Sequence, residues 1–281
     1  KSSSVVATKL QGRPRTGISY DKANEFCTNR GDWITMIDYL EYCALQALCY
    51  IEYANFDNQA TLNTNLTSDG FKQGGLGDGV TNLNWEKWTA FNGNNPIVQT
   101  YWTAEHNIGN GSTNGDHYEL GNYNADGSNL NTYPAVYRGI LNFFGDIWTF
   151  IRDVVIINRN ANYNSVYLLK KGVNYSDITI DNIQDKCYFI GDQTNSNSFI
   201  TEFDFRFGPY FIPNKVGTNK KADYNWIRGS NGQDTDKAVR VLLLGGNAAN
   251  GSAAGSSDFN SSWVRPVSSA NIGFFTTVKL D

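Results

Sequence analysis

Helical periodicity is confined to the first fifth of this chain, and this restriction limits the fold more than any other feature. Ser19 is placed to cap a helix in the run SYDKANEFCTN, which presents Ala23, Phe26 and Cys27 on one face. A second helix is expected with Thr35 as its N-cap and with Asp38 completing a capping box. Apolar residues then follow at helical spacing, and we predict that they face the core: Ile37, Leu40, Ala44, Ala47, Leu48 and Ile51.

The rest of the chain is typical of short strands joined by long turns. Apolar or alternating runs predict strands within 140–157, 165–171, 186–192, 198–212, 238–244 and 272–280, and Gly145 with Asp146 has the pattern of a two-residue hairpin. Residues 56–135 are rich in turn clusters such as GGLGDG and NADGSN. We therefore predict one α+β domain over residues 1–281, with few helices and elaborated loops.

Composition excludes several classes of partner. The formal net charge is −4 and no long basic run is present, so neither a nucleic acid nor an anionic membrane surface is expected to bind. No apolar stretch reaches the length of a membrane span, so we expect no direct membrane insertion. The 35 asparagines and 27 glycines favour irregular loops, whereas the 16 tyrosines supply rigid contact area, which argues against a disordered chain.

The four cysteines, Cys27, Cys43, Cys49 and Cys187, lack the C-x-x-C spacing of a zinc or redox site. We expect them to be small buried hydrophobic residues, with one or two disulfides as the alternative.

The run LLLGGNAANGSAAGSSDFNSSWVRP, residues 242–266, starts as a strand and continues as about twenty small or polar residues. Predicted strands flank this segment on both sides. We therefore expect the sheet to hold both of its ends, which distinguishes the segment from a flexible linker. The aromatic and charged residues near its end are therefore candidates for a contact surface, with the alternative that Phe259 and Trp263 tuck into the domain and cover the loop.

Three segments, taken in order, resemble the formylglycine-generating enzyme family. They are ISYDKANEFCTNRGDWITMIDYLEYCA, YRGILNFFGDIWTFIRD, and RVLLLGGNAANGSAAG with the closing NIGF. The resemblance implies a C-type-lectin-like fold with two helices near the N-terminus, a small twisted antiparallel sheet and long loops. Oxidase members hold copper with two cysteines near the C-terminal end, whereas the last cysteine here is Cys187. Related iron enzymes need several histidines, and this chain has only His106 and His117, so the resemblance implies no catalytic residue and no cofactor.

The C-terminal run is more similar to the variable proteins of diversity-generating retroelements, which are non-enzymatic and share that fold. Gly245, Gly246, Asn250, Gly251, Ala254, Gly255, Ile272 and Gly273 match their frame, while Ala248 and Phe275 replace a common Trp and Arg. This resemblance implies a hypervariable region at about 240–273 on a receptor- or adhesin-type protein at a cell or virion surface. The implied partner is a macromolecule, expected to be a protein on another cell or virion surface. The implied ligand contacts are Ala248, Ala249, Ala253, Asp258, Phe259, Ser262, Trp263, Val264 and Arg265.

Two other functions stay open at this point. One is a metal-dependent oxidase of the formylglycine-generating class with a displaced site. The other is a calcium-dependent, glycan-binding lectin that uses Asn122, Asn124, Asp126 and Ser128, although Tyr133 stands where a calcium loop needs its bidentate Glu.

Overall fold

The computed structural model describes residues 16–58, 136–138, 140–141, 143–145, 147–159, 162–218, 223–228, 238–247, 250, 253–269 and 271–278. These residues form a mixed α+β structure with few helices, which confirms the α+β class. Helices α1 (Tyr20–Thr28) and α2 (Tyr39–Tyr53) precede all the long strands, and the short α5 (Ile183–Lys186) and the 3₁₀ turn η3 (Tyr175–Asp177) come later.

The strands of the main sheet are β4 (Trp148–Asn158), β5 (Tyr163–Leu169), β6 (Cys187–Thr194), β7 (Ser198–Asp204), β8 (Ile212–Gly217), β9 (Tyr224–Trp226), β10 (Val239–Leu244), β11 (Phe259–Asn260) and β12 (Ile272–Gly273). Their order in the sheet is β6-β5-β4-β10-β11-β9-β7-β8, and β12 lies beside β4. Two small sheets pair β1 (Ile34–Met36) with β13 (Thr276–Val278), and β2 (Val136–Tyr137) with β3 (Ile140–Leu141).

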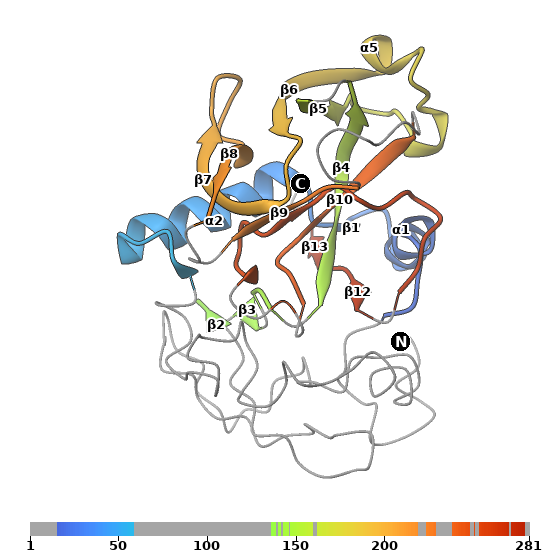
Figure 1. Ribbon diagram of the computed structural model, residues 1–281. Helices are drawn as coiled ribbons and strands as arrows, with labels where there is room; N and C mark the ends of the chain where they lie inside the picture. The colour runs from blue at the N-terminus through green and yellow to red at the C-terminus, as the bar shows by residue number, and fades with distance from the viewer. Residues whose placement is uncertain are drawn as a thin grey trace, which may run out of the picture.

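This sheet differs from the small antiparallel sheet that the family resemblance implied. Its nine strands include two parallel pairings, β11 with β9 and β12 with β4. The sheet also curls, so that β6 and β8, at the two ends of the strand order, lie in contact (Figure 1).

Two hydrophobic clusters occupy the two faces of the central strands β4 and β10. Successive side chains of a strand point to opposite faces, so Val154 and Ile156 join the cluster that contains α2, whereas Val155 and Ile157 join the cluster that contains α1. Figure 1 shows the two helices on opposite sides of these strands. Both faces of the sheet centre are therefore covered, which accounts for the nearly continuous apolar sequence of β10.

The helix caps follow the sequence prediction at α1 and depart from it at α2. The Ser19 side chain accepts from the Lys22 amide, as predicted for the N-cap of α1. The N-cap of α2 is Asp38 rather than Thr35, since Asp38 accepts from the Glu41 amide at 2.9 Å and Glu41 accepts from the Asp38 amide at 3.0 Å. Thr35 lies in β1, where its hydroxyl is 3.3 Å from that of Thr277 on β13.

The predicted aliphatic core stripe of α2 is wrong. Leu40, Leu48 and Ile51 are 50%, 53% and 77% exposed, and Ala44 is also exposed. Ala47 is half-buried, and Ile37 is buried but precedes the helix. The hydroxyl groups of Tyr42 and Tyr50 and the Gln46 Nε2 group donate hydrogen bonds inside the protein. The buried face consists of tyrosines, cysteines and a glutamine: Tyr39, Tyr42, Cys43, Gln46, Cys49 and Tyr50.

Two strand predictions also need correction. The alternating run at 198–212 is a hairpin, because β7 ends at Asp204 and leaves Phe205 and Phe207 exposed at the turn before β8. Gly145 does not form a two-residue hairpin, since β3 pairs with β2 whereas β4 pairs with β5, β10 and β12. Asp146 lies outside the described residues.

All four cysteines are buried and free, which confirms the expectation of small interior side chains over the disulfide alternative. Burial raises the pKa of Cys43 and of Cys49 to about 12, so both thiols are protonated at neutral pH.

Candidate functional site

The Gly-Gly turn after β10 fixes the path of the C-terminal segment. Gly245 and Gly246 have φ angles of 96° and 72°, in the left-handed region that favours glycine. The Gly245 amide donates to the Asp258 carbonyl at 3.1 Å, and the Gly245 carbonyl accepts from the Gly145 amide at 2.9 Å. The sharp turn is therefore held from both sides by backbone hydrogen bonds.

Gly246→Ala is expected to lower the free energy of unfolding by about 2 kcal/mol or more, because it adds left-handed strain and a steric contact. A Cβ atom there would lie 2.5 Å from Asp258 Oδ2 and 3.0 Å from the Ala254 Cα. The matched control is Gly172→Ala, which has a φ of 82° but no atom within 4 Å of the added Cβ. Urea unfolding of the two variants separates strain from contact, and equal losses would contradict the tight packing at Gly246.

A network of buried hydrogen bonds connects residues 256–257 of the C-terminal segment to side chains of α2. Gln46 Nε2 donates to the Ser256 carbonyl at 2.8 Å and to Ser257 Oγ at 2.9 Å. Tyr50 Oη donates to Asp223 Oδ2 at 2.9 Å, and the Ser257 amide donates to Asp223 Oδ1 at 2.9 Å. Because each of these groups is inside the protein and partnered, the network fixes the backbone around 256–257 rather than leaving it free to move.

Two carboxyl groups lie in or beside this network. Burial raises the pKa of Asp223 to about 7, against the opposing hydrogen bonds from Tyr50, the Ser257 amide and Asn58. Burial, with the nearby Asp223 charge, also raises the pKa of Asp258 well above its usual range. Asp258 Oδ1 accepts from Trp226 Nε1 at 2.8 Å, while Oδ2 is buried with no hydrogen-bond partner among the described residues.

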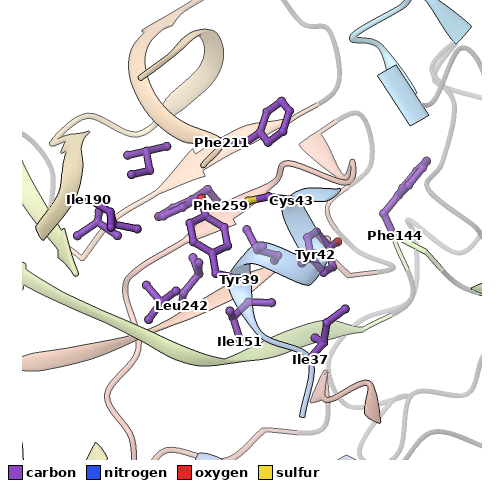
Figure 2. Packing of buried hydrophobic residues seen from close by; sticks show 14 of the residues in the cluster. Ile37, Tyr39, Tyr42, Cys43, Phe144, Ile151, Ile190, Phe211, Leu242 and Phe259 are labelled. Atoms are coloured by element: carbon purple, nitrogen blue, oxygen red, sulfur yellow. The ribbon is translucent and has the colours of Figure 1, made fainter. Parts of the chain in front are cut away.

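Three of the predicted ligand contacts lie in the interior. Ala253 is 7% exposed, and Asp258 and Phe259 are fully buried. Figure 2 shows Phe259 among side chains of α2 and of the sheet, and its ring centroid is 6.5 Å from that of Tyr39. The expectation that Ala253, Asp258 and Phe259 reach a ligand at the surface is therefore corrected, and the alternative of a ring tucked into the domain holds for Phe259. Burial of apolar surface explains the position of Phe259, which fills the core. Burial of the Asp258 carboxyl group is unfavourable in itself, and the hydrogen bond from Trp226 offsets part of this cost.

Four other predicted contacts form what we call the outer segment, residues 262–265: Ser262, Trp263, Val264 and Arg265. All four side chains are partly exposed. Their backbone runs along β10, where Arg240 Nη1 donates to the Ser262 carbonyl at 2.9 Å, the Val241 amide donates to the Trp263 carbonyl at 3.0 Å, and Val264 forms a bridge with Arg240. Arg265 Nε is 3.2 Å from Asp21 Oδ1 of α1.

Several predicted residues lie outside the described part of the chain: Ala248, Ala249, His106, His117, Asp126 and the rest of the calcium-loop pattern. Within the described ranges, no cluster of three or more His, Cys, Asp or Glu side chains is arranged to hold a metal ion. No helix in those ranges is long and apolar enough to cross a membrane.

The network residues Gln46, Tyr50, Asn58 and Asp223 were not identified from the sequence. One signal was available, because Gln46 interrupts the otherwise apolar run at 42–51, and a polar residue there indicates a buried hydrogen-bond partner. Asp223 gave no such signal, since it sits in a polar stretch and reaches the network only through the fold.

A comparison with models of known protein families and with curated proteins finds no match to this chain.

Proposed function

We propose that this chain is a non-enzymatic ligand-binding protein of receptor or adhesin type, displayed at a cell or virion surface. Its contact surface is the outer segment, residues 262–265, within a hypervariable region at about 240–273. The fold proposed for the scaffold is the C-type-lectin-like fold of variable proteins from diversity-generating retroelements. The partner is a protein on another cell or virion surface.

The observation that carries this proposal is the fastening of the outer segment to β10 through its backbone. Contacts from Arg240 and Val241 go to the carbonyl groups of Ser262 and Trp263. These backbone contacts stay in place when the side chains are exchanged. Two side chains add contacts of their own, since Trp263 packs against the cluster that contains α1 and Arg265 pairs with Asp21. A segment that is already ordered also loses little conformational entropy on binding.

The chemistry of the outer segment supports the same conclusion. Trp263 and Arg265 belong to the residue types that contribute most to protein interfaces.

The test is the binding of fluorescently labelled protein to a panel of intact bacterial and cultured animal cells, with protease-treated cells in parallel. We expect at least one cell type to bind the protein through a protease-sensitive receptor, and Trp263→Ala or Arg265→Ala to weaken binding by about tenfold or more. The melting temperature of Arg265→Ala should stay within a few degrees of the parent. Trp263→Ala also loses packing against the cluster that contains α1, so circular dichroism verifies that this variant is folded.

The matched control is Tyr188→Ala, which removes an exposed aromatic side chain of β6 that lies outside the outer segment. Binding that survives Trp263→Ala and Arg265→Ala, or an absence of binding to every cell type, would overturn the proposal.

A further inference from the structure

A second site lies on the sheet at β5 and β6, outside the C-terminal segment. A pocket of about 460 Å³ opens there, and its walls come from β5, β6, α5 and Arg159, the residue that follows β4. Its volume falls within the usual range for small-molecule sites. The lining residues that matter for its chemistry are Arg159, Tyr163, Tyr167, Gln184, Phe189 and Asp192.

A β-bulge brings these side chains to one face. Val166 pairs with Gly191 and Tyr167 pairs with Phe189, so Ile190 is the extra residue on β6. Phe189 and Asp192 are three residues apart and would face opposite sides of a regular strand. Because of the bulge, Phe189 lies opposite Tyr167 while Asp192 lies opposite Ser165, on the same face of β5. The bulge therefore places Phe189 and Asp192 together on the face of β6 that lines the pocket.

The pocket combines exposed rings with fixed polar groups. Tyr163 and Phe189 are 43% and 38% exposed, and the Phe189 ring meets that of Tyr167 at 68° with centroids 5.6 Å apart. Ser165 Oγ donates to Asp192 Oδ1 at 2.9 Å, which orients the carboxylate. The Arg159 guanidinium bonds to the Tyr167 hydroxyl and lies over its ring, 5.9 Å from the centroid.

This arrangement selects a class of ligand. The partly exposed rings of Tyr163 and Phe189 offer apolar surface against which a ring of the ligand can pack. The carboxylate of Asp192, the amide of Gln184 and the guanidinium of Arg159 offer acceptors and donors that a purely apolar ligand would leave unpaired. A sugar satisfies both requirements, since its C–H face packs against an aromatic ring and its hydroxyl groups both donate and accept hydrogen bonds.

An adjoining pocket extends the site. It has a volume of about 360 Å³ and shares Arg159 and Gln184 with the first pocket. Asn158 lines it, and Asn158 Nδ2 is a buried donor without a hydrogen-bond partner among the described residues. Two pockets that meet at shared polar side chains suit a ligand of linked rings better than a single ring.

We propose that these joined pockets bind an oligosaccharide, with Phe189 and Tyr163 against sugar rings and Asp192, Gln184 and Arg159 on the hydroxyl groups. Binding there needs no calcium ion. This site is separate from the outer segment, so either can fail without the other.

The experiment applies the full chain to an array of neutral and sialylated oligosaccharides and then measures the dissociation constant of the strongest binder by calorimetry. We expect a calcium-independent interaction, unchanged by EDTA, that Phe189→Ala and Asp192→Asn each weaken by about tenfold or more. The matched control is Tyr188→Ala, which alters the neighbouring exposed ring of β6 outside the pocket lining and should leave the affinity unchanged.

Circular dichroism and the melting temperature verify that each variant is folded. The proposal is overturned if no glycan binds, if EDTA abolishes binding, or if folded Phe189→Ala and Asp192→Asn variants retain the parent affinity. Saturation-transfer NMR with free tryptophan provides a further check, because binding of tryptophan in place of every glycan would also overturn it.

Discussion

Phe259→Ala is expected to lower the free energy of unfolding by about 3–5 kcal/mol, the usual range for removing a buried phenylalanine ring. The Phe259 ring is fully buried in the cluster between α2 and the sheet (Figure 2). Its backbone also joins β10 to β9, so the cavity would open where the two parts of the sheet meet. Chemical unfolding followed by intrinsic fluorescence measures the loss.

Phe205→Ala is the control for this prediction, since that ring is 50% exposed at the β7–β8 turn and its loss should cost less than about 1 kcal/mol. Equal effects of the two substitutions would contradict the burial of Phe259 and would return this residue to the list of surface ligand contacts.

Stability should fall as the pH rises from about 4 to 7. Asp223 keeps its proton in the folded protein up to its pKa of about 7, whereas an aspartate in the unfolded chain loses its proton near pH 4. Between these values the folded state binds more protons than the unfolded state, so the free energy of unfolding decreases with pH, by about 4 kcal/mol for a shift of this size. Asp153, whose pKa burial raises to about 6, acts in the same direction.

Urea unfolding at successive pH values measures this slope. Asp223→Asn should flatten it, because the amide mimics the protonated carboxyl group and does not titrate. Asp258→Asn should flatten it further, since burial also raises the pKa of Asp258. A slope that is unchanged in Asp223→Asn, or stability that rises over this pH window, would show that Asp223 is ionised inside the folded protein.

Local signals in the sequence predicted the fold where neighbouring residues determine the structure. Ser19 caps α1 through a contact three residues away, and the apolar run of β10 was recognisable because both of its faces are covered. The buried face of α2 was predicted wrongly. Helical spacing shows which residues share a face, but it does not show whether the face with aliphatic residues or the face with tyrosines is buried. Tyr50 is buried because its hydroxyl meets Asp223, which is 173 residues away in the chain.

The candidate site was predictable to a smaller extent. The glycine pattern located the turn at Gly245 and Gly246 correctly. Local composition could not separate the buried pair Asp258 and Phe259 from the partly exposed outer segment, because that division depends on the pairing of β11 with β9. The pocket at β5 and β6 was not predicted. The bulge at Ile190 that forms one of its faces is not visible in the pattern of apolar and polar residues along β6.

The strand order also has a consequence for how this chain reaches its native state. β4, β5 and β6 form one group and β7, β8 and β9 another, and β10 with β11 joins the two groups through residues that come near the end of the described chain. During synthesis, the edges of β4 and β9 that pair with β10 and β11 stay unpaired until residues 239–260 have been made and insert between them. Such non-local closure is slow, so the late-emerging stretch controls the rate at which the nascent sheet is completed.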